Sequence, residues 1–125
     1  MTFSGLRALV VEDEGSIALL LENMLAALGC EVAVSAARVA RACTVAQTGS
    51  FDFAILDVNL AGELGFPVAH ILRERGIPFL FSTGYGEGAV PPEFGTYPVL
   101  SKPFSMKQLR EIIATALSAG GDLRS

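Results

Sequence analysis

Four apolar segments of the chain are each followed by side chains that are suited to phosphoryl chemistry. A run of three acids at 12–14 follows the first segment, Asp57 follows the second, Thr83 the third and Lys102 the fourth. Neighbouring carboxylates repel one another unless a cation lies between them. This combination of acids, a hydroxyl and an ammonium therefore indicates a site for a divalent cation and a phosphoryl group.

Each member of the set has a part in such chemistry. Carboxylate oxygens are ligands for Mg²⁺, which keeps several waters and also binds phosphate. An aspartate such as Asp57 can act as a nucleophile and form an aspartyl-phosphate. Phosphoryl transfer then needs in-line positioning and neutralisation of the phosphoryl oxygens. Mg²⁺ and Lys102 supply positive charge, and the Thr83 hydroxyl supplies a hydrogen bond.

Each residue also has a purely structural explanation when it is taken alone. Acids at 12–14 suit the first turn of a helix, where the helix dipole favours negative charge. Asp57 could be a turn residue, Thr83 a strand-end residue and Lys102 a solvated charge. The functional interpretation depends on all of them following different strands in one chain.

Hydrophobic periodicity alternates between short apolar runs and amphipathic helical patterns. The predicted strands cover 6–11, 31–35, 53–56, 79–81 and 99–101. The predicted helices cover 17–28, 38–47, 66–75 and 106–119, the last with a capping box at Ser105 and Gln108. Between 84 and 98, four glycines and three prolines disfavour a regular fourth helix of normal length.

Repeated alternation of strand and helix predicts an α/β fold with a parallel, doubly wound sheet and helices on both faces. Such a sheet carries its functional site at the carboxyl ends of its strands. The predicted strands would bring Asp57, Thr83, Lys102 and the acids at 12–14 to that edge. We expect one domain over 1–119 and a C-terminal tail over 120–125, which begins with the two glycines expected to end the last helix.

Composition bounds the partners of the chain. It has 125 residues, of which 51% are hydrophobic, and a net charge of −4, so direct binding to nucleic acid is not expected. No apolar run approaches the roughly 20 residues of a membrane span, and no signal peptide is recognisable. Cys30 and Cys43 are expected to be reduced thiols of a cytoplasmic protein.

Four motifs in this order resemble the receiver domain of response regulators in two-component signalling, exemplified by the chemotaxis regulator. They are V-V-E-D-E at 10–14, A-I-L-D-V-N-L at 54–60, S-T-G at 82–84 and L-S-K-P-F at 100–104. The resemblance covers nearly the whole chain. It implies a flavodoxin-like fold with five parallel strands in the order 2-1-3-4-5 and a short or irregular fourth helix.

The resemblance also implies roles for particular residues. Asp57 would accept a phosphoryl group from a histidine kinase or a histidine phosphotransfer protein. Mg²⁺ would be bound by Glu12, Asp13 and Asp57, together with the backbone carbonyl of Asn59. The cofactor implied is therefore Mg²⁺ alone.

Three further expectations follow from the same resemblance. Thr83 would be the hydroxyl that moves toward the phosphoryl group, and Lys102 would pair with a phosphoryl oxygen. The Lys102–Pro103 bond would be cis, which proline permits.

The chain departs from the usual receiver pattern near the last strand. Val99 stands three residues before the lysine, where many receivers have an aromatic switch residue, and Tyr97 is the nearby aromatic. The segment 78–86 also resembles a subgroup whose signature reads Phe-Ala-Thr-Gly-hydrophobic-Tyr. In that subgroup, Tyr85 or the loop after it would carry part of the readout.

The predicted function is a phosphorylation-dependent switch that changes binding to a downstream protein, with at most slow autophosphatase activity. One alternative is a receiver-fold interaction module that works without phosphorylation. Another is a receiver domain excised from a hybrid histidine kinase. A third is a small phosphatase that uses the Asp57–Asn59 segment, although such enzymes usually carry a second aspartate where this chain has Asn59.

Overall fold

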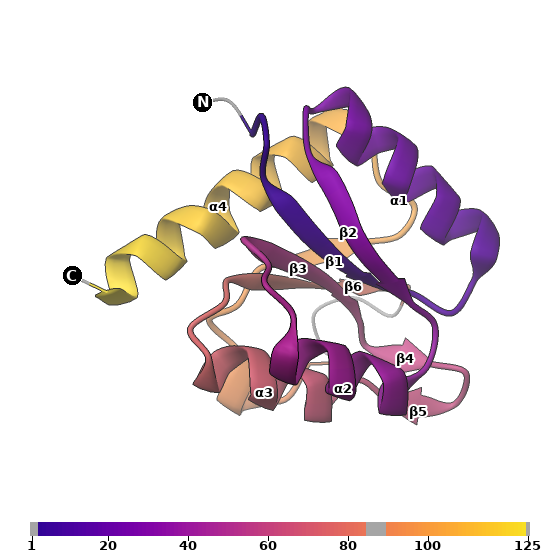
Figure 1. Ribbon diagram of the computed structural model, residues 1–125, viewed down its shortest axis with the longest axis vertical. Helices are drawn as coiled ribbons and strands as arrows, with labels where there is room; N and C mark the ends of the chain where they lie inside the picture. Colours follow the sequence, from indigo (N-terminus) through magenta and orange to yellow (C-terminus); the bar gives the residue numbers. More distant parts are fainter. Residues whose placement is uncertain (1–2, 85–89, 125) are drawn as a thin grey trace.

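A five-stranded parallel sheet forms the centre of the protein in the computed structural model, which describes residues 3–84 and 90–124 (Figure 1). Its strands are β1 (Arg7–Val11), β2 (Glu31–Ala36), β3 (Phe53–Asp57), β6 (Phe79–Thr83) and β7 (Val99–Ser101). Their order is β2-β1-β3-β6-β7. Because these are the first to fifth strands of the sheet in chain order, the predicted order 2-1-3-4-5 is confirmed.

Helices cover both faces of the sheet, as the alternating pattern predicts. These helices are α1 (Gly15–Ala27), α2 (Val39–Thr48), α3 (Phe66–Glu74) and α4 (Met106–Arg124). In Figure 1, α1 and α4 lie on one side of the sheet and α2 and α3 on the other. A small antiparallel hairpin, β4 (Asn59–Leu60) and β5 (Glu63–Leu64), follows β3.

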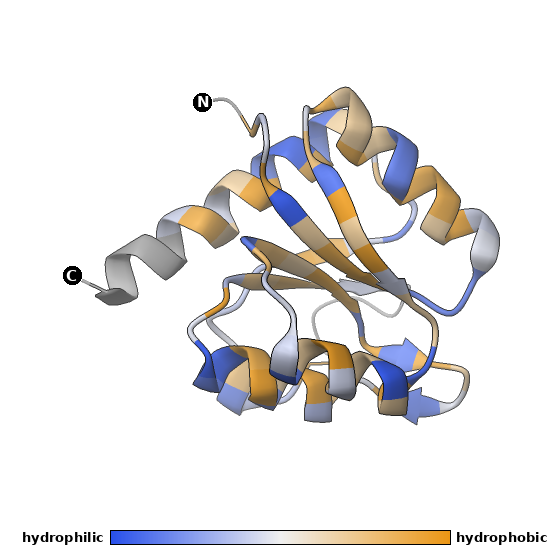
Figure 2. Cartoon of the chain, in the orientation of Figure 1, coloured by the Kyte–Doolittle hydropathy of each residue, from blue (hydrophilic) through white to orange (hydrophobic). Residues whose placement is uncertain are grey.

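Alternating strand residues divide the core into two clusters. Val10, Ile55, Leu80 and Leu100 pack with residues of α1 and α4, including Leu21. A second cluster on the other face packs the strands against α2 and α3; its strand members include Leu9, Leu56 and Phe81. Figure 2 shows apolar and polar positions alternating around the helices, as expected when one stripe of each faces the sheet.

The last helix begins as predicted but does not end as predicted. Ser105 N–H donates to Gln108 Oε1 (2.7 Å), and Gln108 N–H donates to Ser105 Oγ (3.1 Å), which confirms the capping box. The helix then continues through Gly120 and Gly121 to Arg124, so the expected end at 119 is wrong. Glycine keeps both backbone hydrogen-bonding groups and costs a helix only about 1 kcal/mol relative to alanine. The domain boundary at 119 stays a prediction.

The expected irregularity before the last strand is present. In the described part of the segment, 84 and 90–98, the regular element is a single 3₁₀ turn, η2 (Pro92–Phe94). Phe94 is fully buried and anchors this turn against β6 and α3. Among the described residues, no helix has both the length and the apolar character needed to cross a membrane.

Candidate functional site

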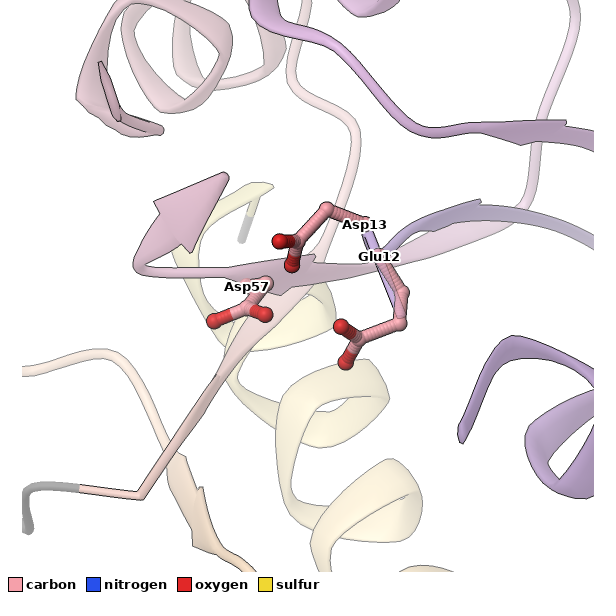
Figure 3. Close-up of side chains that lie close together, drawn as sticks. All are labelled: Glu12, Asp13 and Asp57. Atoms are coloured by element: carbon pink, nitrogen blue, oxygen red, sulfur yellow. The ribbon is translucent and has the colours of Figure 1, made fainter. Parts of the chain in front are cut away.

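Three carboxylates meet at the carboxyl edge of the sheet. Glu12 and Asp13 directly follow β1, and Asp57 is the last residue of β3. One carboxylate oxygen from each lies within 4.8 Å of the other two. Figure 3 shows the three side chains converging from these neighbouring strands. The site exists because β1 and β3 pair in parallel, with Val11 beside Leu56, so both strands end at the same level.

Asp57 is held by contacts to both of its oxygens. Oδ1 accepts a hydrogen bond from the Asn59 backbone N–H (3.2 Å). Oδ2 accepts one from Lys102 Nζ (3.0 Å). Only 5% of Asp57 is exposed, so these contacts replace most of its hydration.

Lys102 joins two of the carboxylates. Its Nζ lies 2.8 Å from Glu12 Oε1 and 3.0 Å from Asp57 Oδ2. Burial alone would lower the pKa of Lys102, but the hydrogen bonds and charges of Glu12 and Asp57 outweigh it, so this pKa is raised. The ammonium therefore stays charged and screens the two acids from each other.

Glu12 is the most strongly perturbed acid of the site. Burial is the main cause, and it raises the pKa of Glu12 from 4.5 to about 7, against the lowering effects of Lys102 and of the Glu14 N–H. That N–H donates to Glu12 Oε2 (3.1 Å). An acid in this environment gains from a further cation, because ionisation is then favoured.

The hairpin after β3 orients the third carboxylate. Asp13 Oδ2 accepts a hydrogen bond from the Ala61 N–H (3.1 Å) at the tip of the hairpin. Asn59 Oδ1 accepts one from the Gly62 N–H (2.9 Å), which closes the turn. The Asn59 side chain thus has a structural role here, and the predicted use of its backbone carbonyl as a ligand stays a prediction.

The remaining predicted residues lie at the same edge. Thr83 is buried and ends β6, where it pairs with Ser101 of β7. The Lys102–Pro103 bond is cis, as predicted. Tyr85 lies outside the described residues.

Two features of the site were missed by sequence reasoning. A Cβ at Gly65 would lie 2.5 Å from the Asp57 carbonyl oxygen, so only glycine lets the start of α3 approach the end of β3 so closely. Ser82, beside Asp57 on β6, is a buried polar residue. The glycine before α3 was visible in the sequence, but the close approach depends on the fold.

The donor set fits Mg²⁺. Three carboxylates that offer oxygens within 4.8 Å of one another are hard ligands for a small divalent cation. Two of them, Glu12 and Asp57, are buried, which adds to the cost of leaving the acids uncompensated.

Comparison with known proteins gives a consistent assignment. A sequence profile described as the response regulator receiver domain matches residues 8–114. A probable transcriptional regulator, ycf27, from Cyanophora paradoxa is 36% identical over 115 residues, which are 89% of this chain and 48% of that protein. The chain thus spans about half the length of this curated relative.

Solved structures agree. The solution structure of SdrG from Sphingomonas melonis Fr1 is 41% identical, covers 96% of this chain and 98% of its own, and has a TM-score of 0.78. The BeF3-activated conformation of SdrG, from Pseudomonas melonis Fr1, is 39% identical with the same TM-score and covers 93% of this chain and 99% of its own.

The sheet topology and the three carboxylates at its carboxyl edge agree with these comparisons, and the resemblance to the receiver class suggested by the four motifs is confirmed. This chain belongs to the response regulator receiver domain family. Receiver domains of this family are signalling switches of two-component systems and in general are not enzymes.

Proposed function

We propose that Asp57 is the phosphoacceptor of this switch and that Mg²⁺ binds beside it. The observation that carries the proposal is the placement of the Asp57 carboxylate. One of its oxygens lies 3.0 Å from the Lys102 ammonium. A carboxylate oxygen of Asp57 also lies within 4.8 Å of carboxylate oxygens of Glu12 and Asp13, so the three groups could share one metal ion. Phosphoryl transfer to aspartate needs a nucleophilic carboxylate and positive charge near the phosphoryl oxygens, which Lys102 supplies on one side and a bound ion would supply on the other.

The residues around Asp57 have different roles in this reaction. Glu12, Asp13 and Asp57 would hold the ion, which supplies positive charge for the phosphoryl oxygens when bound. Lys102 supplies the second positive charge. Attack by an Asp57 oxygen on the phosphorus of a phosphohistidine forms the O–P bond and releases the histidine nitrogen. The Asn59 N–H, which now contacts Oδ1, orients the carboxylate for that step.

The partners proposed are those that membership of the receiver family implies. We propose a histidine kinase or histidine phosphotransfer protein as the donor and a downstream protein as the target, with the exchange taking place in the cytoplasm. Thr83, at the end of β6, would move toward the phosphoryl group and favour the signalling conformation. Hydrolysis of the aspartyl-phosphate by the domain itself would be slow.

The test is phosphorylation by a small-molecule donor, acetyl phosphate, with Mg²⁺ and with EDTA, read by intact mass. We expect labelling of the wild type with Mg²⁺ and no labelling of Asp57→Asn. Asp52→Asn is the matched control, since Asp52 lies just before the opposite end of β3 and accepts a hydrogen bond from the Arg7 N–H (2.7 Å). Equal labelling of wild type and Asp57→Asn would refute the assignment.

A second measurement uses beryllofluoride as a phosphoryl mimic. The SdrG structure described as BeF3-activated is that of a similar domain, and we expect beryllofluoride with Mg²⁺ to shift the amide signals of Asn59 and Thr83 here. If neither acetyl phosphate nor beryllofluoride has any effect, the phosphorylation-independent interaction module becomes the better interpretation.

A further inference from the structure

Ser82 is a buried hydroxyl beside the proposed phosphorylation site. It is 1% exposed, and its Oγ has no hydrogen-bond partner among residues 3–84 and 90–124. Buried hydroxyls are nearly always hydrogen-bonded, because water no longer compensates an unpaired one. A hydroxyl left without a partner in one state of a switch is a candidate to gain one in another state.

The register of the sheet places Ser82 next to Asp57 on the same face. The two residues are partners on the paired parallel strands β3 and β6. Two residues earlier on each strand, Ile55 and Leu80 belong to the core cluster beneath α1 and α4. Because strand side chains alternate with a period of two, Ser82 and Asp57 also project toward that face.

Lys102 reaches its partners across the strand that carries Ser82. The strand order is β1-β3-β6-β7, and Lys102 extends β7, its N–H donating to the Thr83 carbonyl (2.9 Å). Its Nζ contacts Asp57 at the end of β3 and Glu12 after β1. The side chain must therefore cross β6, and the β6 residue level with Asp57 on this face is Ser82.

The two partners of Lys102 are also two of the three carboxylates of the metal cluster. A divalent cation competes with the ammonium for these oxygens and repels it. Displacement away from the cluster takes the ammonium back toward its own strand, which is the direction of Ser82. An ammonium has three N–H donors, and a hydroxyl oxygen can accept one of them.

We propose that Ser82 is a positioning residue whose hydroxyl accepts a hydrogen bond from the Lys102 ammonium when a magnesium ion occupies the carboxylate cluster. This inference rests on the proposed function, because it needs the ion to bind at Glu12, Asp13 and Asp57. The hydroxyl keeps Lys102 close to the site, ready to pair with a phosphoryl oxygen, while the ion takes its former partners.

The chain is well suited to a direct test, because its only lysines are Lys102 and Lys107. The ammonium signals of ¹⁵N-labelled protein can be followed by NMR with and without MgCl₂. Lys107, whose side chain is 83% exposed, serves as the internal reference. The Asn59 and Ala61 amides, which donate to Asp57 and Asp13, report independently whether the ion has bound.

Four proteins form the comparison: wild type, Ser82→Ala, and the nearly isosteric pair Ser82→Thr and Ser82→Val. With Mg²⁺, we expect the Lys102 ammonium protons of Ser82→Ala to exchange with water about fivefold faster than those of the wild type, through loss of the hydrogen bond. Ser82→Thr should exchange more slowly than Ser82→Val, because only the former keeps a hydroxyl. Without Mg²⁺, wild type and Ser82→Ala should be alike.

The outcomes separate this inference from the proposed function. If the Asn59 and Ala61 amides shift with Mg²⁺ but Lys102 exchanges equally in wild type and Ser82→Ala, the role of Ser82 is overturned and the metal site stands. If those amides do not respond to Mg²⁺, both the metal site and the role of Ser82 are overturned. A difference that is the same with and without Mg²⁺ also overturns the role, because it would reflect packing alone. Thermal unfolding of each variant checks that the fold is kept, and Ser82→Thr against Ser82→Val decides the question if Ser82→Ala does not fold.

Discussion

Two neighbouring regions of this domain are held together by opposite means. The carboxylate cluster, Glu12, Asp13 and Asp57 with Lys102 between two of them, gathers like charges that need a cation. The aromatic cluster, around β6 and η2, consists of neutral rings that are held by packing against one another. Its members are Phe66, Phe79, Phe81, Phe94 and Tyr97.

The difference lies in what each region can respond to. Carboxylates can be protonated, bind metal ions and accept phosphoryl groups, so the carboxylate cluster can change its charge and its contacts. Neutral rings packed closely, such as Phe79 and Tyr97 with a centroid distance of 4.2 Å, are sensitive only to changes in packing. The aromatic cluster therefore anchors the irregular segment that stands where a fourth helix is expected, while the carboxylate cluster carries the signal.

The largest effect should come from the aromatic cluster. Phe94→Ala removes a fully buried ring that contacts Phe66, Phe81 and the Arg73 guanidinium, 4.6 Å from its centroid. We expect a loss of about 3–5 kcal/mol in the free energy of unfolding, measured by urea denaturation. Phe104→Ala, at a partly buried ring, should cost less. A similar loss for both would contradict a special anchoring role for Phe94.

Lys102→Met should have the next largest effect and should depend on metal. The variant keeps most of the aliphatic stem and leaves Glu12 and Asp57 without their cation, at a cost of about 2 kcal/mol in unfolding free energy. Mg²⁺ should reduce the difference in unfolding free energy between Lys102→Met and the wild type, because in the variant the ion does not compete with an ammonium for the carboxylates. The loss of unfolding free energy in Phe94→Ala, relative to the wild type, should not change with Mg²⁺. If the loss in Lys102→Met is also independent of Mg²⁺, the contrast between the two regions is wrong.

The pH dependence of stability should expose Glu12. Its pKa is raised from 4.5 to about 7 by burial, so the protonated form contributes stability that is fully present below pH 4.5. That stability is lost as pH rises through about 7. In EDTA, the stability of Glu12→Gln relative to the wild type should therefore increase as the pH is raised. Parallel curves for the two proteins, measured by thermal unfolding, would show that Glu12 does not titrate in this way.

The smallest effect is expected at the edge of the aromatic cluster. His70 Nε2 and Glu93 Oε1 lie 3.5 Å apart, with both side chains about half exposed. Glu93→Gln should change the unfolding free energy by less than about 0.5 kcal/mol. A loss comparable to that of Phe94→Ala would mean that charge, rather than packing, holds η2 against α3.

Much of the site could be predicted because its chemistry restricts residue types. Asp57 and Lys102 follow strands that the hydrophobic pattern identifies, and parallel strands end at one edge of the sheet. The order of the sheet and the cis bond before Pro103 came from the resemblance, and both are confirmed. The end of α4 was predicted wrongly, because glycine disfavours a helix without preventing one.

Other features depend on contacts that no local pattern encodes. The close approach of Gly65 to the Asp57 carbonyl requires α3 to begin directly over the end of β3. The stacking of Tyr97 on Phe79 depends on the path of the chain between β6 and β7. The position of Ser82 level with Asp57, on the strand between β3 and β7, depends on the order and register of the strands.

The sequence by itself determined the class of fold, the edge at which the site lies and the chemical identity of its groups. Periodicity and residue type are local properties, and a parallel sheet turns them into a common edge. Only the tertiary structure decided which groups touch, how deeply Glu12 is buried and which buried hydroxyl has no hydrogen-bond partner within the described part of the chain. Those properties arise from distances between residues far apart in the chain, which are set when the two faces of the sheet are packed.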